Sequence, residues 1–113
     1  MTRVYFSHSY RDVDEEVNSF FIDLMKELLW EIAVDPPNPK ILYEKIAKHI
    51  EDSDFVVVIV TRREFDEKSN TWLPSPWISQ EIGMTMMAQK PLLIFVEEGV
   101  SVTDVVEGAL GQK

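Results

Sequence analysis

The stretch Phe55-Val56-Val57-Val58-Ile59-Val60 is an unbroken apolar run in which most side chains are β-branched. β-Branched residues favour extended strands. A run without polar interruption is typical of a parallel strand that is covered on both of its faces. We therefore expect this segment to be the central strand of a sheet with helices on both sides.

Helical and extended patterns alternate on either side of this strand. Apolar residues recur at helical spacing in three segments, and three further short apolar segments match strands. Asp12 is the expected N-cap of the first helix, and Asn38 with Pro39 is expected to begin the second. The predicted strands are 3–7, 32–34, 55–60 and 92–96, and the predicted helices are about 13–30, 39–50 and 77–88. Residues 61–75 are expected to form a loop with one helical turn at 64–67.

This alternation predicts an α/β fold, a flavodoxin-like open parallel sheet with helices on both faces. A chain of 113 residues is long enough for a single domain, 1–113. Four strands and three helices are about one strand-helix unit short of a complete domain of this type, so we expect truncation at the C-terminal end. Ligands bind such sheets beyond the carboxyl ends of the strands. That rule selects 7–11, 35–37, 61–63 and Glu97.

The helix that follows the long loop carries the acid of greatest interest. Ser75 is the expected N-cap, and Pro76 the first helical residue. Trp77 and Glu81 are four residues apart and should share a helical face. We expect that face to differ from the apolar stripe that packs on the sheet, which consists of Ile78, Ile82 and Met86.

Composition excludes several classes of function. The net charge is −9, from 20 acidic and 11 basic residues, which argues against a nucleic-acid partner because such binding depends on neutralising phosphates. The chain has no cysteine, so disulfides, thiolate metal sites and a cysteine nucleophile are excluded. Its longest apolar run, 55–60, is far shorter than the ~20 residues of a membrane helix. We expect a soluble, cytoplasmic protein that does not bind a membrane.

Several common site motifs are absent. Neither a G-x-G-x-x-G fingerprint nor a P-loop occurs. A phosphate-receiver domain needs acids where this chain has Ser7 and Thr61. His8 and His49 are the only histidines, and the sequence offers neither a convincing carboxylate partner, so we expect no metal site. His8 is expected to be a polar loop residue.

Four segments in order resemble one family. They are Val4-Tyr5-Phe6-Ser7-His8-Ser9-Tyr10-Arg11-Asp12, the stretch 50–61, Trp77-Ile78-Ser79-Gln80-Glu81, and Lys90-Pro91-Leu92-Leu93-Ile94. Together they resemble the Toll/interleukin receptor (TIR) domain family in its bacterial and archaeal form. The chain departs from that pattern in its stiff loop Asp35-Pro36-Pro37-Asn38-Pro39, and we expect the family's final strand and helix to be missing or truncated.

The resemblance implies an activity and a set of site residues. Active members of the family cleave the nicotinamide-ribose bond of NAD, and their essential glutamate, that of W-x-x-x-E, corresponds to Glu81. NAD would then be a substrate, and no cofactor is expected. One carboxylate suffices in principle, because it can stabilise the oxocarbenium-like ribose that nicotinamide leaves behind. The expected ligand-binding residues are Ser7, Tyr10, Arg11, Asp35 and Trp77. The family also implies self-association and a role in signalling or defence.

Two other functions stay open at this point. One is a non-catalytic TIR-like module for signalling, oligomerisation or nucleotide sensing. The other is a nucleoside deoxyribosyltransferase-like enzyme, which also uses one glutamate at a glycosidic carbon. Plainer explanations exist for single residues as well: Glu81 as a solvated surface acid, Arg11 paired with Asp12 or Asp14, Trp77 as simple packing, and Met84, Met86 and Met87 as packing on the helix face.

Overall fold

A four-stranded parallel sheet forms the centre of the computed structural model, which describes residues 1–35 and 43–101. The strands are β1 (Arg3–Ser7), β2 (Glu31–Ala33), β3 (Phe55–Val60) and β6 (Leu92–Val96), arranged in the order β2-β1-β3-β6. β3 lies between two partners, as expected of the central apolar strand. The predicted α/β, flavodoxin-like open sheet is therefore confirmed.

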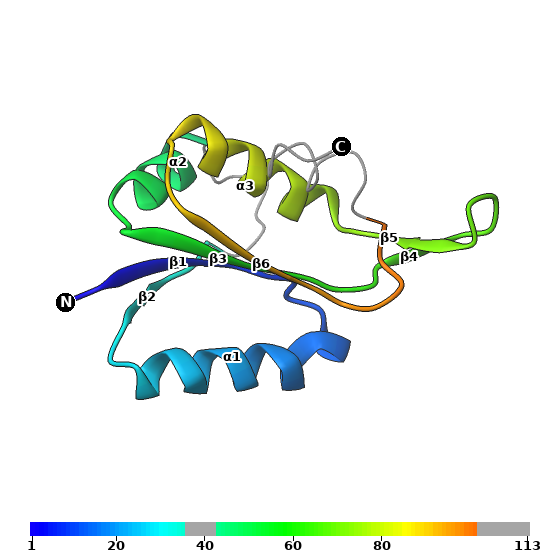
Figure 1. Ribbon diagram of the computed structural model, residues 1–113, viewed down its shortest axis with the longest axis horizontal. Coiled ribbons are helices and arrows are strands. Elements are labelled where there is room, and N and C mark those ends of the chain that lie inside the picture. Colours follow the sequence, from blue (N-terminus) through cyan, green and yellow to red (C-terminus); the bar gives the residue numbers. More distant parts are fainter. Residues whose placement is uncertain (36–42, 102–113) are drawn as a thin grey trace.

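Helices cover both faces of the sheet. Helix α1 (Glu15–Glu27) lies on one face, and α2 (Tyr43–Glu51) and α3 (Pro76–Met87) lie on the other (Figure 1). Each face has its own apolar core. The α1 side packs Val4, Phe6, Met25, Val57 and Ile59. The α2/α3 side packs Tyr5, Ala33, Ile46, Ile50, Val56, Val58, Val60, Ile78, Ile82 and Val100.

Residues of β1 and β3 contribute alternately to the two cores, because successive side chains of a strand point to opposite faces of the sheet. Every residue of β3 after Phe55 is buried, which explains why its sequence lacks polar interruption. The strand order reverses between β1 and β3, since β2 lies outside β1 and β6 lies outside β3. The carboxyl ends of β1 and β3 therefore mark the switch point at which such sheets bind ligands.

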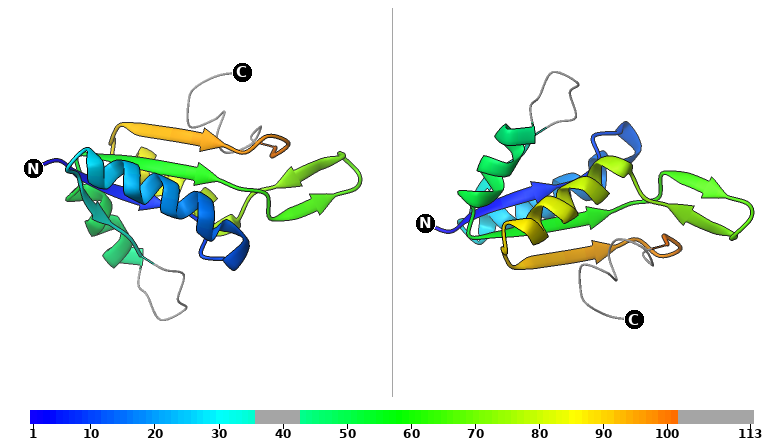
Figure 2. Two further views of the ribbon diagram at one scale, coloured as in Figure 1. Left: turned by 90° about the horizontal axis from the view of Figure 1, so that it is seen from below. Right: turned by 90° about the horizontal axis from the view of Figure 1, so that it is seen from above.

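The segment between β3 and α3 differs from the prediction. In place of a loop with a helical turn, it forms an antiparallel hairpin of β4 (Glu64–Asp66) and β5 (Thr71–Leu73), which projects beyond the main sheet (Figure 2). Phe65 and Trp72 stack edge to face with ring centroids 5.4 Å apart. This cross-strand aromatic pair stabilises a hairpin that the polar sequence around it does not suggest.

Element ends also differ in detail. Asp12 does not cap α1; it begins a short 3-10 helix, Asp12–Asp14, and α1 starts at Glu15. The second strand is Glu31–Ala33 and so begins one residue earlier than predicted. The predicted start of the second helix at Asn38 and Pro39 lies outside the described residues.

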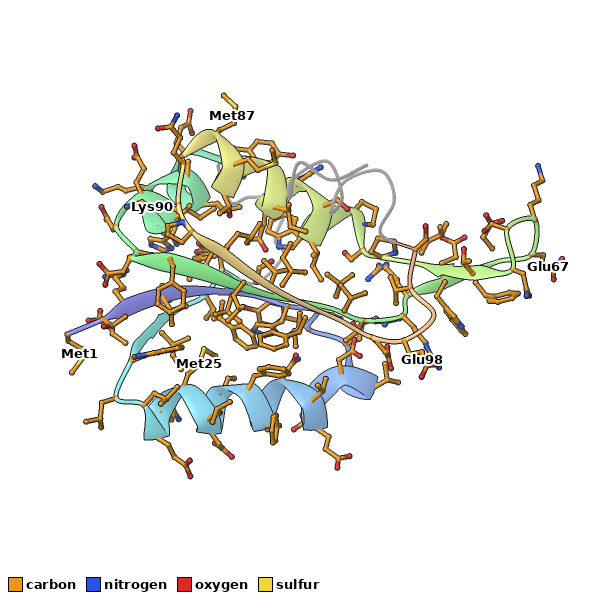
Figure 3. All side chains as sticks on the ribbon, in the orientation of Figure 1. Met1, Met25, Glu67, Met87, Lys90 and Glu98 are labelled. Atoms are coloured by element: carbon orange, nitrogen blue, oxygen red, sulfur yellow. The ribbon has the colours of Figure 1, made fainter. Side chains whose placement is uncertain are left out.

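Two methionines predicted to pack do not do so. Met86 is 45% exposed and Met87 is 86% exposed, and Met87 points away from the sheet (Figure 3). Thr85, which is fully buried, takes the core position expected for Met86. Its hydroxyl donates to the Glu81 carbonyl oxygen at 2.8 Å, so this buried polar group has its partner. Met84 does pack against the core, as predicted.

None of the helices in the described part of the chain is long and apolar enough to cross a membrane.

The α2/α3 core provides a test of the fold. Ile50 is fully buried, so Ile50→Ala removes buried methylenes and leaves a cavity. We expect this variant to lose about 2–5 kcal/mol of unfolding free energy, measured by urea denaturation. Met87→Ala, at an exposed position, should change it by less than about 0.5 kcal/mol. Equal losses in the two variants would contradict the packing described.

Candidate functional site

Glu81 lies on the side of α3 that faces the sheet. Ser75 caps the helix as predicted, because its Oγ accepts a hydrogen bond from the Trp77 amide at 3.2 Å. The buried residues of α3 are Ile78, Glu81, Ile82 and Thr85. Glu81 is only 2% exposed, so both the expectation of a separate face and the plainer one of a solvated acid are wrong. The face of α3 that packs on the sheet is therefore wider than the stripe of Ile78 and Ile82 and also includes Glu81.

Two residues of β1 hold the Glu81 carboxylate. The Tyr5 hydroxyl donates to Oε2, and the Ser7 Oγ donates to Oε1 at 2.6 Å. Tyr5 and Ser7 are two residues apart on one strand, so their side chains point to the same face. Ser7 was among the predicted site residues. Tyr5 was not, although its place two residues before Ser7 was a usable signal.

Burial decides the protonation of Glu81. Desolvation raises the pKa of Glu81 to about 7 and outweighs the hydrogen bonds from Ser7 and Tyr5, which lower it; the negative charge of Asp35 adds to the rise. Glu81 is therefore a carboxyl group whose protonation changes near neutral pH. The pKa of Tyr5 is raised as well, first by burial and then by the charge of Glu81, so its phenol stays a proton donor.

Asp35 and His49 form a second polar pair on the same side of the sheet. Asp35 is 4% exposed, and its Oδ2 lies 2.6 Å from His49 Nδ1. The expectation that the sequence supplies no carboxylate partner is thus wrong for His49. The sequence indicates part of this arrangement, because His49 stands between Ile46 and Ile50 in the chain and both of these residues of α2 are buried. The partner was not readable, because Asp35 and His49 are 14 residues apart and on different elements.

Tyr10 lies at the rim, where β1 leads into α1. It is 41% exposed, and its pKa is raised by partial burial and by the charges of Glu81 and Asp35. The His8 ring lies between Phe6 and Tyr10, with ring centroids 4.3 Å from each. His8 lies in the loop after β1, as predicted, but it is only 5% exposed, and burial lowers its pKa.

The structure does not bring Arg11 to Glu81. Its guanidinium pairs with Asp14 at 3.2 Å and donates to the carbonyl oxygens of Arg62 and Arg63. The plainer expectation of an Arg11–Asp14 pair is therefore confirmed. These contacts tie the start of α1 to the loop after β3.

Trp77 is partly buried and packs against the α2/α3 core. Its indole Nε1 is buried and has no hydrogen-bond partner among the described residues. A buried donor without a partner costs free energy.

A separate groove lies on the α1 side of the sheet. Its volume is about 590 Å³, and its lining includes Phe20, Phe21 and Phe95 together with the acids Asp14, Glu16 and Glu97. The groove does not include Glu81. No group of three or more potential metal ligands occurs within 1–35 and 43–101.

Comparisons with known proteins add a structural relative. No protein-family model matches the chain, and no curated protein matches it by sequence. Among solved structures, it is similar to that of the Clostridium botulinum CMP N-glycosidase BcmB, with a TM-score of 0.63 and 17% sequence identity. The match covers 97% of this chain and 82% of that chain. At this identity, the similarity establishes the open α/β fold that both chains share.

Glu81 should make stability depend on pH. Its folded pKa of about 7 lies above the ordinary value of 4.5, so the folded state binds this proton more tightly than the unfolded state. The contribution is complete below pH 4.5 and is lost as pH rises through 7. Relative to Glu81→Gln, which cannot titrate, the wild type should lose about 3 kcal/mol between about pH 4 and pH 8. Urea unfolding of both chains across this range tests it, and parallel curves would contradict the assignment.

Removing one donor should shift that titration. Tyr5→Phe deletes the hydroxyl that stabilises the ionised carboxylate, so the pKa of Glu81 should rise above 7. Carbon-13 NMR of the glutamate carboxyl groups can follow it. Tyr43→Phe is the matched control, because Tyr43 bonds Gln80 instead. A Glu81 pKa in Tyr5→Phe that is unchanged or lower than in the wild type would contradict the assigned hydrogen bond.

Proposed function

We propose that this chain cleaves the N-glycosidic bond of a nucleotide, with the Glu81 carboxylate acting at C1′ of the ribose. One observation carries the proposal. A 2%-exposed glutamate has both carboxylate oxygens hydrogen-bonded by β1, at the switch point of a doubly wound sheet. The apolar packing of α3 does not require an acid at position 81, and burial of the Glu81 carboxyl group costs desolvation free energy.

The chemistry suits one fixed carboxylate. When the bond from C1′ to the base nitrogen breaks, the electron pair leaves with the base and positive charge develops on the ribose. A carboxylate that is already oriented and shielded from bulk water stabilises that charge strongly. The Tyr5 and Ser7 hydroxyls fix both oxygens, so Glu81 needs no reorientation when the charge appears. It acts in its ionised form, which predominates above pH 7.

The relative of known activity supports this class of reaction. BcmB is described as a CMP N-glycosidase, and its structure follows nearly the whole of this chain. The fold similarity and the buried glutamate at the sheet's switch point are independent observations that favour the same chemistry. A nucleoside deoxyribosyltransferase-like activity would use the same carboxylate, with a second base or sugar in place of water.

A finer proposal is that the nucleotide is NAD, as in the TIR family. Trp77, one turn before Glu81, favours it, because the indole offers an apolar surface and its buried Nε1 has no hydrogen-bond partner among the described residues. Self-association, signalling and defence belong to this finer proposal. A TIR-like module that binds nucleotide without turnover is its non-catalytic form.

Base release is the direct test. Purified wild-type chain at high concentration is incubated with CMP, NAD or deoxycytidine, and free base or nicotinamide is measured by chromatography. We expect Glu81→Gln to lower the rate on the accepted substrate at least about 100-fold, since a charge-stabilising group is lost. Glu67→Gln, at an exposed acid of the hairpin, is the matched control and should retain full activity.

The outcomes separate the candidates. Release from CMP alone favours a BcmB-like glycosidase, whereas release from NAD alone favours the TIR-like enzyme. Activity that survives in Glu81→Gln would overturn the assignment of Glu81. No release from any substrate, with CMP or NAD still raising the melting temperature, would leave the non-catalytic module.

A further inference from the structure

Asp35 lies beside the residues that hold Glu81. In the parallel pairing of β1 with β2, Tyr5 is opposite Ala33. Two residues further along each chain come Ser7 and Asp35, so both stand at the carboxyl ends of neighbouring strands. They are 1% and 4% exposed. When it is ionised, the Asp35 carboxylate raises the pKa of Tyr5, Tyr10 and Glu81, so it lies within electrostatic range of all three.

His49 reaches Asp35 from the helix layer above the sheet. Its neighbours in α2, Ile46 and Ile50, belong to the same core as Tyr5 and Ala33. The Nδ1 atom lies 2.6 Å from Asp35 Oδ2, a short and direct contact. The His49 side chain is 28% exposed, whereas that of Asp35 is 3% exposed. The His49 end of the pair is therefore accessible to solvent, whereas the Asp35 end is shielded from it.

We propose that Asp35 and His49 form a proton relay, in which the Asp35 carboxyl group protonates the departing base and His49 resupplies it from solvent. The inference rests on the proposed N-glycosidase function and deepens it. It assigns the site to nucleotides whose base leaves as a neutral molecule only after it gains a proton, such as cytosine. A cationic base such as nicotinamide leaves as a neutral molecule without one.

The step balances in protons and electrons. The bond between C1′ and the base nitrogen breaks, its electron pair goes to that nitrogen, and the nitrogen takes the proton of Asp35. Water then adds to C1′ and loses its proton to solvent, and the Asp35 carboxylate regains a proton from solvent through His49. The products are the free base and ribose phosphate, and the relay returns to its starting state. Glu81 stabilises the ribose cation throughout and supplies no proton.

The other titratable groups at the site are less suited to this task. Tyr5 and Tyr10 both have pKa values raised further above neutrality, so neither releases a proton readily. Glu81 must be ionised to stabilise the cation. His49 is the described titratable residue in direct contact with Asp35, and its side chain reaches solvent.

Two substrates that differ only in the base test the relay. CMP and nicotinamide mononucleotide are both ribose 5′-phosphates, but cytosine needs a proton to leave and nicotinamide does not. We expect Asp35→Asn to lower kcat for CMP by roughly 100- to 10,000-fold, the usual contribution of a general acid. For nicotinamide mononucleotide, the loss should stay below about 10-fold. His49→Gln, which keeps Asp35 in place, should show the same selectivity to a smaller degree.

The controls separate failure of the relay from failure of the proposed function. Glu81→Gln should abolish cleavage of both substrates. Equal losses on CMP and nicotinamide mononucleotide in both Asp35→Asn and His49→Gln would assign the pair to structure or ribose binding and overturn the relay. Wild-type cleavage of nicotinamide mononucleotide alone would also overturn it. Wild-type inactivity on both substrates, with a native melting transition, would refute the glycosidase function and the relay with it.

If the chain accepts CMP alone, the second substrate is 4-nitrophenyl ribofuranoside 5-phosphate, whose phenolate leaves without a proton. Retained cleavage of this compound by Asp35→Asn, with CMP cleavage lost, supports the relay. Loss of both would overturn it.

Discussion

The hydrogen bonds from Tyr5 and Ser7 to Glu81 are the constraint on which the rest of the site depends. A carboxyl group that is 2% exposed has lost its water and must find partners within the protein. Both partners come from β1, the strand at the switch point of the sheet. The contact therefore fixes α3 to the sheet at one position and aims the acid at the edge where ligands bind such folds. It also sets a compromise, since burial raises the pKa of Glu81 while the hydroxyls favour its charge.

The two faces of the sheet have separate chemical characters. On the α2/α3 side, polar groups sit inside an otherwise apolar core: Tyr5, Ser7, Glu81, Asp35 and His49. On the α1 side, the groove between α1 and β6 is apolar with an acidic margin. Buried polar groups are retained in a core where their hydrogen bonds are made and where they have a role. This contrast is a physical reason to place the proposed reaction on the α2/α3 side of the sheet.

A division of labour between two carboxyl groups gives the site its proposed chemistry. Glu81 is held by neutral hydroxyl donors and is suited to stabilise a cation. Asp35 is held by an imidazole and is suited to exchange a proton with it. The two tasks are separable, because the demand for a proton depends on the leaving base. The two resemblances therefore lead to different expectations for Asp35 and His49. A CMP N-glycosidase, whose fold this chain shares, releases a base that needs a proton, whereas the W-x-x-x-E segment of the TIR pattern implies release of nicotinamide, which needs none.

The sequence by itself determined the layers of this protein. The apolar run 55–60 and the helical repeats on either side suffice for an open parallel sheet, because burial of alternate faces depends on local periodicity. It also identified Glu81, Ser7 and Asp35 as site candidates from their places at strand ends and in W-x-x-x-E. Tertiary structure alone decided that Glu81 faces inward to Tyr5 and Ser7 and that Asp35 contacts His49. It also decided that a polar segment folds as a hairpin around Phe65 and Trp72. These outcomes depend on contacts between different helices and strands, which the periodicity of a single segment does not encode.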